Sequence, residues 1–312
     1  MHFIPIEELK GRKKSALLKF LARYEEFCVQ LSAQIRKTSS CVYAVFASEV
    51  QNGGKEADSD SCNIYGIVSI RKTILHCLPY ANIENPTAMQ EDFVGAFAAL
   101  FSSGGFENPV CVNGMQNGSA LILKALGFLG FEPQQTNEYC LLKLDIEEFK
   151  KWIDKGEMNE RQGLSVIRCR SDIPAEIRAE VFELQKKYEV EEVVPACLTF
   201  DEDSCRLRLA NSFRTQYILA LAVNENGAEK IVAKAGTNAV GRKHVQLGGV
   251  YTLPEYRGWR YALYLMTVLL VRLLKMRCIP VLFVKKKNVP ALGLYKSLSF
   301  KNKGDYTISY FK

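Results

Sequence analysis

The feature that most constrains the fold is a repeated order of expected elements along the 312 residues of the chain. In the second half, apolar and alternating runs predict strand, helix, strand, helix and strand at 244–252, 260–276, 280–284, 288–298 and 306–311. The first half has the same order, at 64–70, 91–101, 109–112, 118–129 and 139–144. This repeat predicts two similarly folded domains in tandem, each of α/β type with a mixed sheet.

A charged stretch suggests where the two domains meet. Residues 145–163 interrupt the pattern. We therefore expect three parts: an N-terminal domain at 1–150, a linker at 151–163 and a C-terminal domain at 164–312. Apolar spacing predicts that the first domain opens with a helix over about 3–38. The second is expected to open with a strand at 164–170 and a helix capped by Ser171 or Asp172.

The net charge of +7 is distributed unevenly. Residues 1–150 carry 14 Lys and Arg against 17 Asp and Glu, whereas residues 151–312 carry 27 against 17. Within 240–312 the count is 14 against 2, a net charge of +12. An anionic partner is therefore expected at the C-terminal quarter, with a solvated basic face as the simpler alternative.

The cysteines and apolar runs limit the class of protein. The ten cysteines form no close C-x-x-C pairs and only three histidines accompany them, so we expect no metal site. Scattered cysteines without an expected signal peptide favour a cytoplasmic protein with reduced thiols. The apolar run at 261–271 is too short to span a bilayer, so no membrane segment is expected.

The loop GVYTLPEYRGWRYA at 249–262 joins an expected strand to an expected helix. Backbone N–H groups at such a helix start can converge on an anion, and the helix dipole adds partial positive charge there. Gly258 allows close approach of the backbone to a ligand, and the Arg257 guanidinium can donate two hydrogen bonds to phosphate oxygens. A pyrophosphate suits this loop, although a strand-to-helix connection without a ligand would have the same pattern.

Two further segments complete a family pattern. VLFVKKKN ends a buried-type strand at Asn288, and NVPALGLYKSLSF follows as a helix that carries Tyr295. With the loop at 249–262, this order resembles the GCN5-related N-acetyltransferases (GNAT), in a bacterial branch with an extra N-terminal domain. The resemblance is clear over 164–312 and implies an acetyl-CoA-dependent N-acetyltransferase acting on a primary amine.

The same resemblance implies where acetyl-CoA would bind. The strand at 249–252 would diverge from its parallel neighbour, and its backbone would pair with the pantetheine arm. N–H groups of the loop would hold the pyrophosphate, and the Asn288 side chain would bind the pantetheine. The implied cofactor-binding residues are Tyr251, Thr252, Arg257, Gly258, Trp259, Arg260, Tyr261, Ala262 and Asn288.

Tyr295 is the implied catalytic residue, a general acid that protonates the departing thiolate. A backbone N–H of the diverging strand would polarise the thioester carbonyl. The amine must lose a proton, and the base stays open, with His244 and Glu192 as candidates. Taken alone, Tyr295 could be a core aromatic residue and Asn288 only a helix cap.

Arg260 departs from the family pattern, which usually has glycine there. Its side chain could contact phosphate or obstruct the site.

The first half departs further from the family pattern, because NIYGIVSI is not followed by the glycine motif and NGSALILKALGFLG has no tyrosine. We therefore expect the N-terminal domain to be a degenerate copy without cofactor binding.

Two other classes of function remain as alternatives. A non-catalytic CoA- or acyl-CoA-binding module would keep the fold without turnover. A nucleic-acid binder could use the basic C-terminal quarter, but no stacking-aromatic array, helix-turn-helix or zinc finger supports it.

Overall fold

The computed structural model of the protein describes residues 1–37, 40–47, 64–81, 88–156 and 163–312. The chain divides into two compact units. Unit 1 comprises Met1–Tyr139 and Gly304–Lys312, and unit 2 comprises Cys140–Lys303. In the residues so described, no helix combines the length and the apolar character needed to cross a lipid bilayer.

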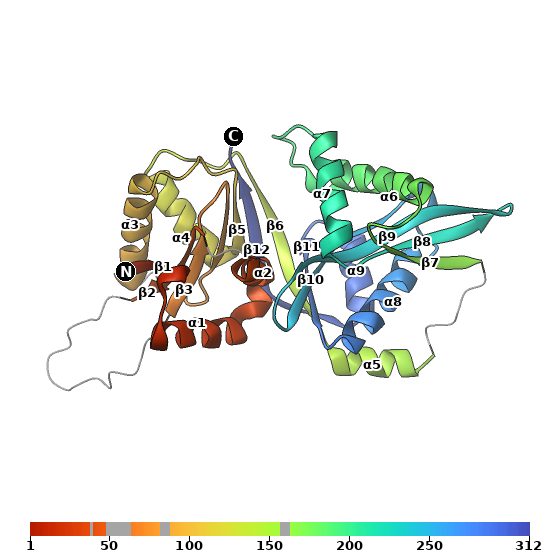
Figure 1. The fold of residues 1–312 in the computed structure, drawn as a ribbon, viewed down its shortest axis with the longest axis horizontal. Helices are drawn as coiled ribbons and strands as arrows, with labels where there is room; N and C mark the ends of the chain where they lie inside the picture. Colours follow the sequence, from red (N-terminus) through yellow and green to blue (C-terminus); the bar gives the residue numbers. More distant parts are fainter. Residues whose placement is uncertain (38–39, 48–63, 82–87, 157–162) are drawn as a thin grey trace. The chain divides into compact units, whose positions relative to one another are not determined.

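Most of the first repeat lies in unit 1 (Figure 1). Its elements in chain order are β1 (His2–Pro5), α1 (Gly11–Tyr24), α2 (Val29–Lys37), β2 (Val42–Phe46), β3 (Ile64–Ser69), β4 (Thr73–Cys77), α3 (Ala88–Ser103), β5 (Cys111–Met115), α4 (Gln116–Gly127) and β6 (Gln135–Leu144). Strands β1 to β5 follow one another in the sheet. Only β4 and β5 pair in parallel among them, and the other pairs are antiparallel.

The second repeat lies mostly in unit 2. After α5 (Ile146–Asp154) its elements are β7 (Leu164–Cys169), α6 (Ala175–Tyr188), the π-helix η3 (Glu189–Val193), α7 (Glu202–Thr215), β8 (Ile218–Glu225), β9 (Ala228–Val240), β10 (His244–Thr252), the 3-10 turn η4 (Pro254–Tyr256), α8 (Tyr261–Lys275), β11 (Ile279–Lys285), α9 (Val289–Ser297) and β12 (Phe300–Tyr310). The sheet order is β6-β11-β10-β9-β8-β7, in which β10 and β11 are parallel.

The two repeats have the same order of elements. Each has a strand, two α-helices, three strands, a helix, a strand, a helix and a final strand within the described residues. Both contain a parallel pair, β4 with β5 and β10 with β11. The predicted class, tandem α/β domains with a mixed sheet, is confirmed.

The final strands of the repeats cross between the units. Residues Tyr306–Tyr310 of β12 pair antiparallel with Cys111–Met115 of β5, so the end of the chain belongs to unit 1. Conversely, Cys140–Leu144 of β6 belong to unit 2, where β6 lies beside β11. The units therefore have bounds that differ from the predicted 1–150 and 164–312, because strand pairing rather than chain order decides where the ends lie.

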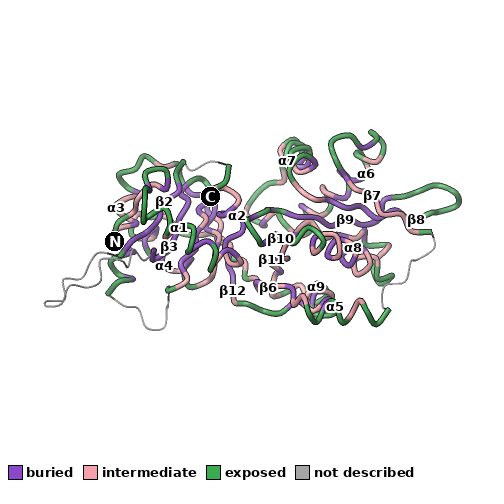
Figure 2. The backbone as a smooth tube through the Cα atoms, turned by 60° about the horizontal axis from the view of Figure 1, so that its bottom comes forward, coloured by how far each residue is buried: buried purple, intermediate pink, exposed green. Residues whose placement is uncertain are grey.

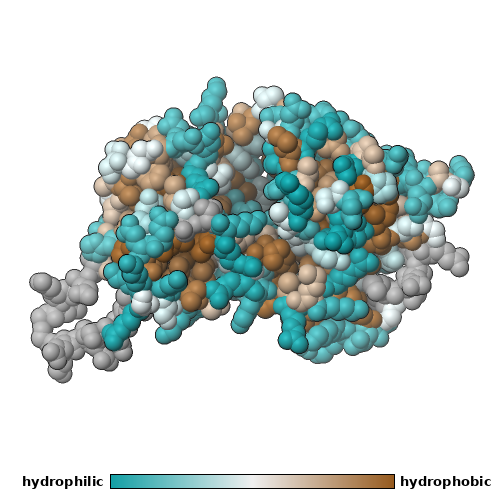
Figure 3. All heavy atoms as spheres, in the orientation of Figure 1, coloured by the Kyte–Doolittle hydropathy of each residue, from teal (hydrophilic) through white to brown (hydrophobic). Residues whose placement is uncertain are grey.

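Each unit buries its own apolar side chains on both faces of its sheet. In unit 2, α8 and α9 cover one face with Leu265, Leu269 and Leu298, and α6 and α7 cover the other with Phe182 and Phe213. The strands are the most buried parts of both units, as Figure 2 shows. The outer side of α7 is largely hydrophilic in Figure 3, so this helix is amphipathic and contributes only one face to the core.

Some local predictions were wrong. The segment 3–38 begins with β1, which pairs with β2, and is helical only from Gly11. Pro174 rather than Ser171 or Asp172 is the N-cap of α6. Helix α7 was missed, because its mostly polar sequence carries a weak apolar period. The predicted linker contains the end of α5, and its residues 157–162 lie outside the described residues.

His76 fills the place in unit 1 where the parallel strands part. Pairing of β4 with β5 ends at Leu75 and Asn113, one residue before His76. The imidazole is 2% exposed, and its Nε2 lies 2.9 Å from Ser119 Oγ. A Cβ atom on Gly114 would stand 2.1 Å from Nε2, so only glycine leaves room for the ring. In unit 2 the position after the last residue of β10 that pairs with β11 is Gly248, where a Cβ atom would stand 2.0 Å from the Asn238 side chain.

The buried His76 makes a prediction for stability in acid. Burial lowers the pKa of His76 to about 3. The unfolded chain therefore binds a proton below pH about 6.5 that the folded chain does not, and stability falls as the pH falls towards 3. This group alone should lower the free energy of unfolding by about 2 kcal/mol between pH 7.5 and pH 5.

Urea denaturation at the two pH values measures this difference, with His76→Asn as the matched control. Asn keeps a hydrogen-bonding side chain but does not titrate. We expect the variant to be less stable at pH 7.5 and to lose less stability on acidification. An equal loss in both proteins would contradict the assignment.

Candidate functional site

The site begins where β10 and β11 part. Their parallel pairing runs from His244 with Ile279 to Leu247 with Leu282 and then stops. Beyond it, Gly248–Thr252 continue β10, while Phe283–Lys285 continue β11. On the other side, the register of β10 with β9 shifts between Gly248 and Tyr251, which marks a bulge. Backbone groups of the diverging section thus face an opening between two parallel strands.

The loop after β10 has the backbone of an anion-binding turn. Gly258 has φ +85° and Arg260 has φ +60°, ψ +23°, which is the left-handed conformation. Left-handed residues in such a turn direct successive N–H groups into one concavity. Arg260 is the N-cap of α8, and no side chain caps this helix. The first N–H groups of α8, those of Tyr261 and Ala262, have no intrahelical acceptor.

Arg260 therefore stands in a position that glycine suits by conformation. A left-handed residue with a Cβ costs roughly 1–2 kcal/mol relative to the right-handed region. Its side chain is exposed, as is that of Trp259.

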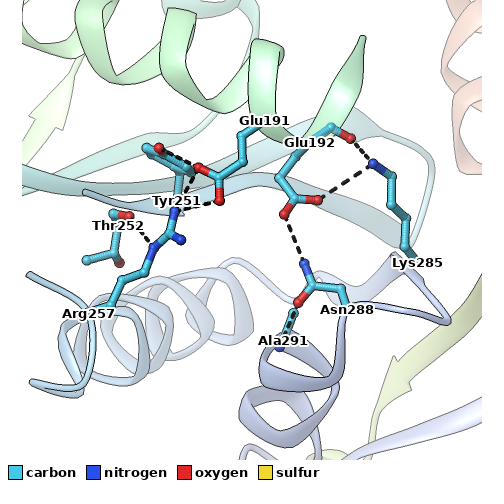
Figure 4. Close-up of polar contacts among 8 residues, drawn as sticks. All are labelled: Glu191, Glu192, Tyr251, Thr252, Arg257, Lys285, Asn288 and Ala291. Carbon is cyan, nitrogen blue, oxygen red and sulfur yellow. Dashed lines mark hydrogen bonds and ion pairs between the residues drawn. The ribbon is translucent and has the colours of Figure 1, made fainter. Parts of the chain in front are cut away.

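The Arg257 guanidinium is held by an acidic partner (Figure 4). Its two bonds to Glu191 are both 2.8 Å long, and its Nε donates to the Thr252 carbonyl at 3.1 Å. The Tyr251 hydroxyl also donates to Glu191, at 2.8 Å. The hydrogen bond from Arg257 lowers the pKa of the Glu191 carboxyl. The Arg257 N–H is engaged too, since it donates to the Pro254 carbonyl at 3.2 Å.

Asn288 caps α9 and contacts a second glutamate. Its Oδ1 accepts from the Ala291 N–H at 3.1 Å, and its Nδ2 donates to Glu192 at 3.2 Å. Lys285 Nζ donates to the Glu192 carbonyl and lies 3.7 Å from its carboxylate. Figure 4 shows Glu191 facing the end of β10 and Glu192 facing the end of β11.

Sequence reasoning missed this arrangement. Glu192 was considered only as a base, and Glu191 was not considered. Both belong to η3, whose sequence EVEEV follows α6. The acidic sequence of η3 and the basic residues after β10 and β11 could have suggested charge pairing. The sequence alone does not show that η3 lies beside the ends of these strands.

Tyr295 lies buried on α9. It is 7% exposed, and its ring packs edge-on to Phe300 with centroids 5.8 Å apart. Burial raises the pKa of the Tyr295 phenol well above its usual value, and Tyr188 and Glu192 add to this effect. The phenol is therefore neutral at physiological pH and carries a proton.

The structure brings the predicted residues to one end of the β10–β11 pair. Tyr251 and Thr252 lie on the diverging strand, 257–262 at the turn, and Asn288 and Tyr295 on α9. Thr252 Oγ1 is buried and has no hydrogen-bond partner within the part of the chain that the structure describes. An elongated ligand with phosphate at one end fits this set, provided that it displaces Glu191 from the Arg257 guanidinium.

Comparison with known proteins adds the family. Residues 179–300, which contain every predicted site residue, match the acetyltransferase (GNAT) family model. None of the curated proteins matches the sequence. A tandem GNAT protein from the clavulanic acid biosynthesis pathway is 11% identical, with 99% of this chain and 97% of that chain covered and a TM-score of 0.54.

Two further solved structures cover nearly the whole chain. A Drosophila protein is 10% identical over 99% of this chain and 97% of its own, with a TM-score of 0.59. An acetyltransferase of the GNAT family from Colwellia psychrerythraea is 10% identical over 97% and 98%, with a TM-score of 0.50. At these identities the likeness concerns the fold. Residues 179–300 thus match the acetyltransferase (GNAT) family model, and the fold of the chain is similar to that of a tandem GNAT protein.

Proposed function

We propose that unit 2 transfers the acetyl group of acetyl-CoA to a primary amine by direct attack. The observation that carries this proposal is the parting of β10 and β11 beside the N-terminus of α8, with the buried Tyr295 on the adjoining α9. The proposal places a thioester along the diverging strand and its phosphates at the helix start.

The residues would divide the work as follows. Backbone groups of Tyr251 and Thr252 would pair with the pantetheine arm, and Thr252 Oγ1 would gain a partner. N–H groups of 258–262 would hold the pyrophosphate. Because the Arg257 N–H is already bonded, this residue would contribute through its guanidinium. The Nδ2 group of Asn288 would donate to the ligand instead of Glu192, while its Oδ1 would still cap α9.

Tyr295 would supply the proton that the departing thiolate needs. Its raised pKa keeps the phenol protonated before reaction. A backbone N–H of the diverging strand would stabilise the negative charge on the carbonyl oxygen.

Unit 1 is proposed to lack this activity. His76 occupies the space between its parallel strands, and α4 has no tyrosine. Its role would then be structural, or would lie in binding a partner.

One observation favours a second candidate, a non-catalytic CoA-binding module. Two of the proposed cofactor ligands, Arg257 and Asn288, are engaged by Glu191 and Glu192. A ligand must displace these carboxylates, which would weaken binding or leave a binding site without turnover.

Acetyl-CoA binding and turnover separate the two candidates. We expect calorimetry to show binding, and thiol release to rise with at least one primary amine. Tyr295→Phe should leave the Kd for acetyl-CoA unchanged and reduce kcat by about 10²- to 10⁴-fold, because the general acid is removed. Tyr264→Phe, on α8, is the control and should keep kcat. Binding without turnover would favour the module, and absence of binding would refute both candidates.

Arg260 allows a second test, which separates its backbone from its charge. Arg260→Gly should raise the free energy of unfolding by up to about 1 kcal/mol, because glycine relieves the left-handed strain. Arg260→Ala keeps that strain but removes the charge. Both variants should bind acetyl-CoA about two- to fivefold more weakly if the exposed cation attracts phosphate. Tighter binding by either would show that the side chain obstructs the site.

A further inference from the structure

A cavity lies in unit 2 on the side of the sheet that α6 and α7 cover. Its volume is about 240 Å³, and it is bounded by α6, η3, α7, β9 and the Gly248–Gly249 bulge of β10. Pockets for drug-sized ligands measure roughly 300–1,000 Å³, so this cavity suits a small molecule or a single side chain. It adjoins the section of β10 that parts from β11.

Lys234 of β9 lines this cavity. The residue is 4% exposed, and its Nζ donates to the Gly249 carbonyl at 2.9 Å. Nζ also lies 4.4 Å from the centre of the Tyr188 ring. A neutral lysine amine has two N–H bonds and one lone pair, so the bond to Gly249 leaves the lone pair available to the cavity.

Among the described residues, no carboxylate is in direct contact with Lys234 Nζ. Glu189 of η3 lines the same cavity but accepts from Gln185 at 2.9 Å and from Arg208 at 2.5 Å. The other titratable groups that face Lys234 are Tyr188 of α6, Cys205 of α7 and Cys169 of β7. Burial lowers the pKa of Lys234 to about 7 despite the attraction of Glu189.

The cavity reaches the diverging section of β10. Gly248 and Gly249 of this section line it. The Tyr188 ring also lines it and packs edge-on to Tyr251 of the same section, with centroids 6.1 Å apart. Lys234 Nζ, bonded to the Gly249 carbonyl, therefore stands beside the backbone that parts from β11.

We propose that this cavity admits the acceptor amine and that Lys234 is the base that removes its proton. This role rests on the proposed acetyl transfer. The amine nitrogen forms a bond to the thioester carbon as the carbon–sulfur bond breaks. One proton leaves the amine nitrogen for Lys234 Nζ, and one leaves the Tyr295 hydroxyl for the sulfur. Exchange with water then returns Lys234 and Tyr295 to their starting states.

The lining also defines the class of acceptor. It combines apolar residues and glycines with amide and hydroxyl side chains, namely Gln185, Ser212, Gln216, Thr237 and Asn238. Glu189, the one carboxylate in the described lining, is already bonded to Gln185 and Arg208. A second ammonium group would meet no carboxylate without a bonded partner among the described lining residues, so the geometry points to a small monoamine rather than a polyamine.

The first test needs no acceptor. Trace acetylation with acetic anhydride at pH 5 to 11, followed by peptide mass spectrometry, reports which lysines are neutral and reachable. Lys234 should react half-maximally near pH 7. Lys230, exposed on the same strand, is the internal control and should react only near pH 10 or above. Labelling of Lys234 only above pH 10, or none at any pH, would overturn the assignment.

The second test compares wild type with Lys234→Met and Lys234→Arg. Both variants should bind acetyl-CoA like wild type and lose about 10²- to 10⁴-fold in kcat, because neither side chain takes a proton near neutral pH. The wild-type kcat should rise with pH through about 7, and this rise should be absent from both variants. Full activity in Lys234→Arg would show that the residue supplies only charge and overturn its role as base.

Glucosamine, serine and spermidine serve as probe amines. If none of them reacts, the variants are compared by thiol release from the hydrolysis of acetyl-CoA, in which water is the nucleophile. Spermidine as the best acceptor would refute the monoamine class. Absence of acetyl-CoA binding in wild type would refute the proposed function. Binding together with wild-type thiol release in Lys234→Met would refute only the role of Lys234.

Discussion

Everything in the candidate site depends on the loss of hydrogen bonding between β10 and β11 after Leu247 and Leu282. Parallel strands in a buried sheet normally pair along their length, because buried N–H and C=O groups need partners. Here the bulge at Gly248–Tyr251 turns β10 away. Its backbone then no longer pairs with β11, and Gly248 and Gly249 line the cavity of Lys234. One local defect in the sheet thus creates both the proposed cofactor site and the proposed acceptor site.

The defect is accompanied by acidic side chains. Glu191 and Glu192 bind Arg257, Lys285 and Asn288, so the cations of Arg257 and Lys285 are paired without a ligand. A carboxylate offers the same kind of acceptor oxygens as a phosphate or an amide carbonyl. The protein therefore keeps its cationic groups ordered, and any anionic ligand competes with an internal one. In unit 1 a buried imidazole, His76, follows the last residue of β4 that pairs with β5.

Much of this could be read from the sequence because it depends on local patterns. Strand 244–252 was predicted with its observed bounds, and α8 and α9 within one or two residues, since long apolar periods and the Asn288 cap define them. The tandem order followed from the same periods. Helix α7 could not be read, because its mostly polar sequence carries a weak apolar period. Strand β1 and the engagement of Arg257 could not be read either, because each depends on a partner distant in the chain. Lys234 carried no signal in the sequence, since its burial arises only when β9 is covered by α6 and η3.

The exchange of final strands has a consequence for how the chain is made. Residues 1–139 emerge from the ribosome long before Tyr306–Tyr310, yet β5, already paired with β4 on one side, obtains its second neighbour only from Tyr306–Tyr310. The sheet of unit 1 must therefore keep an open edge at β5 until β12 has been made. The gene therefore cannot be divided between its repeats without loss. A stop codon placed there would leave unit 1 without β12, the strand that pairs with β5.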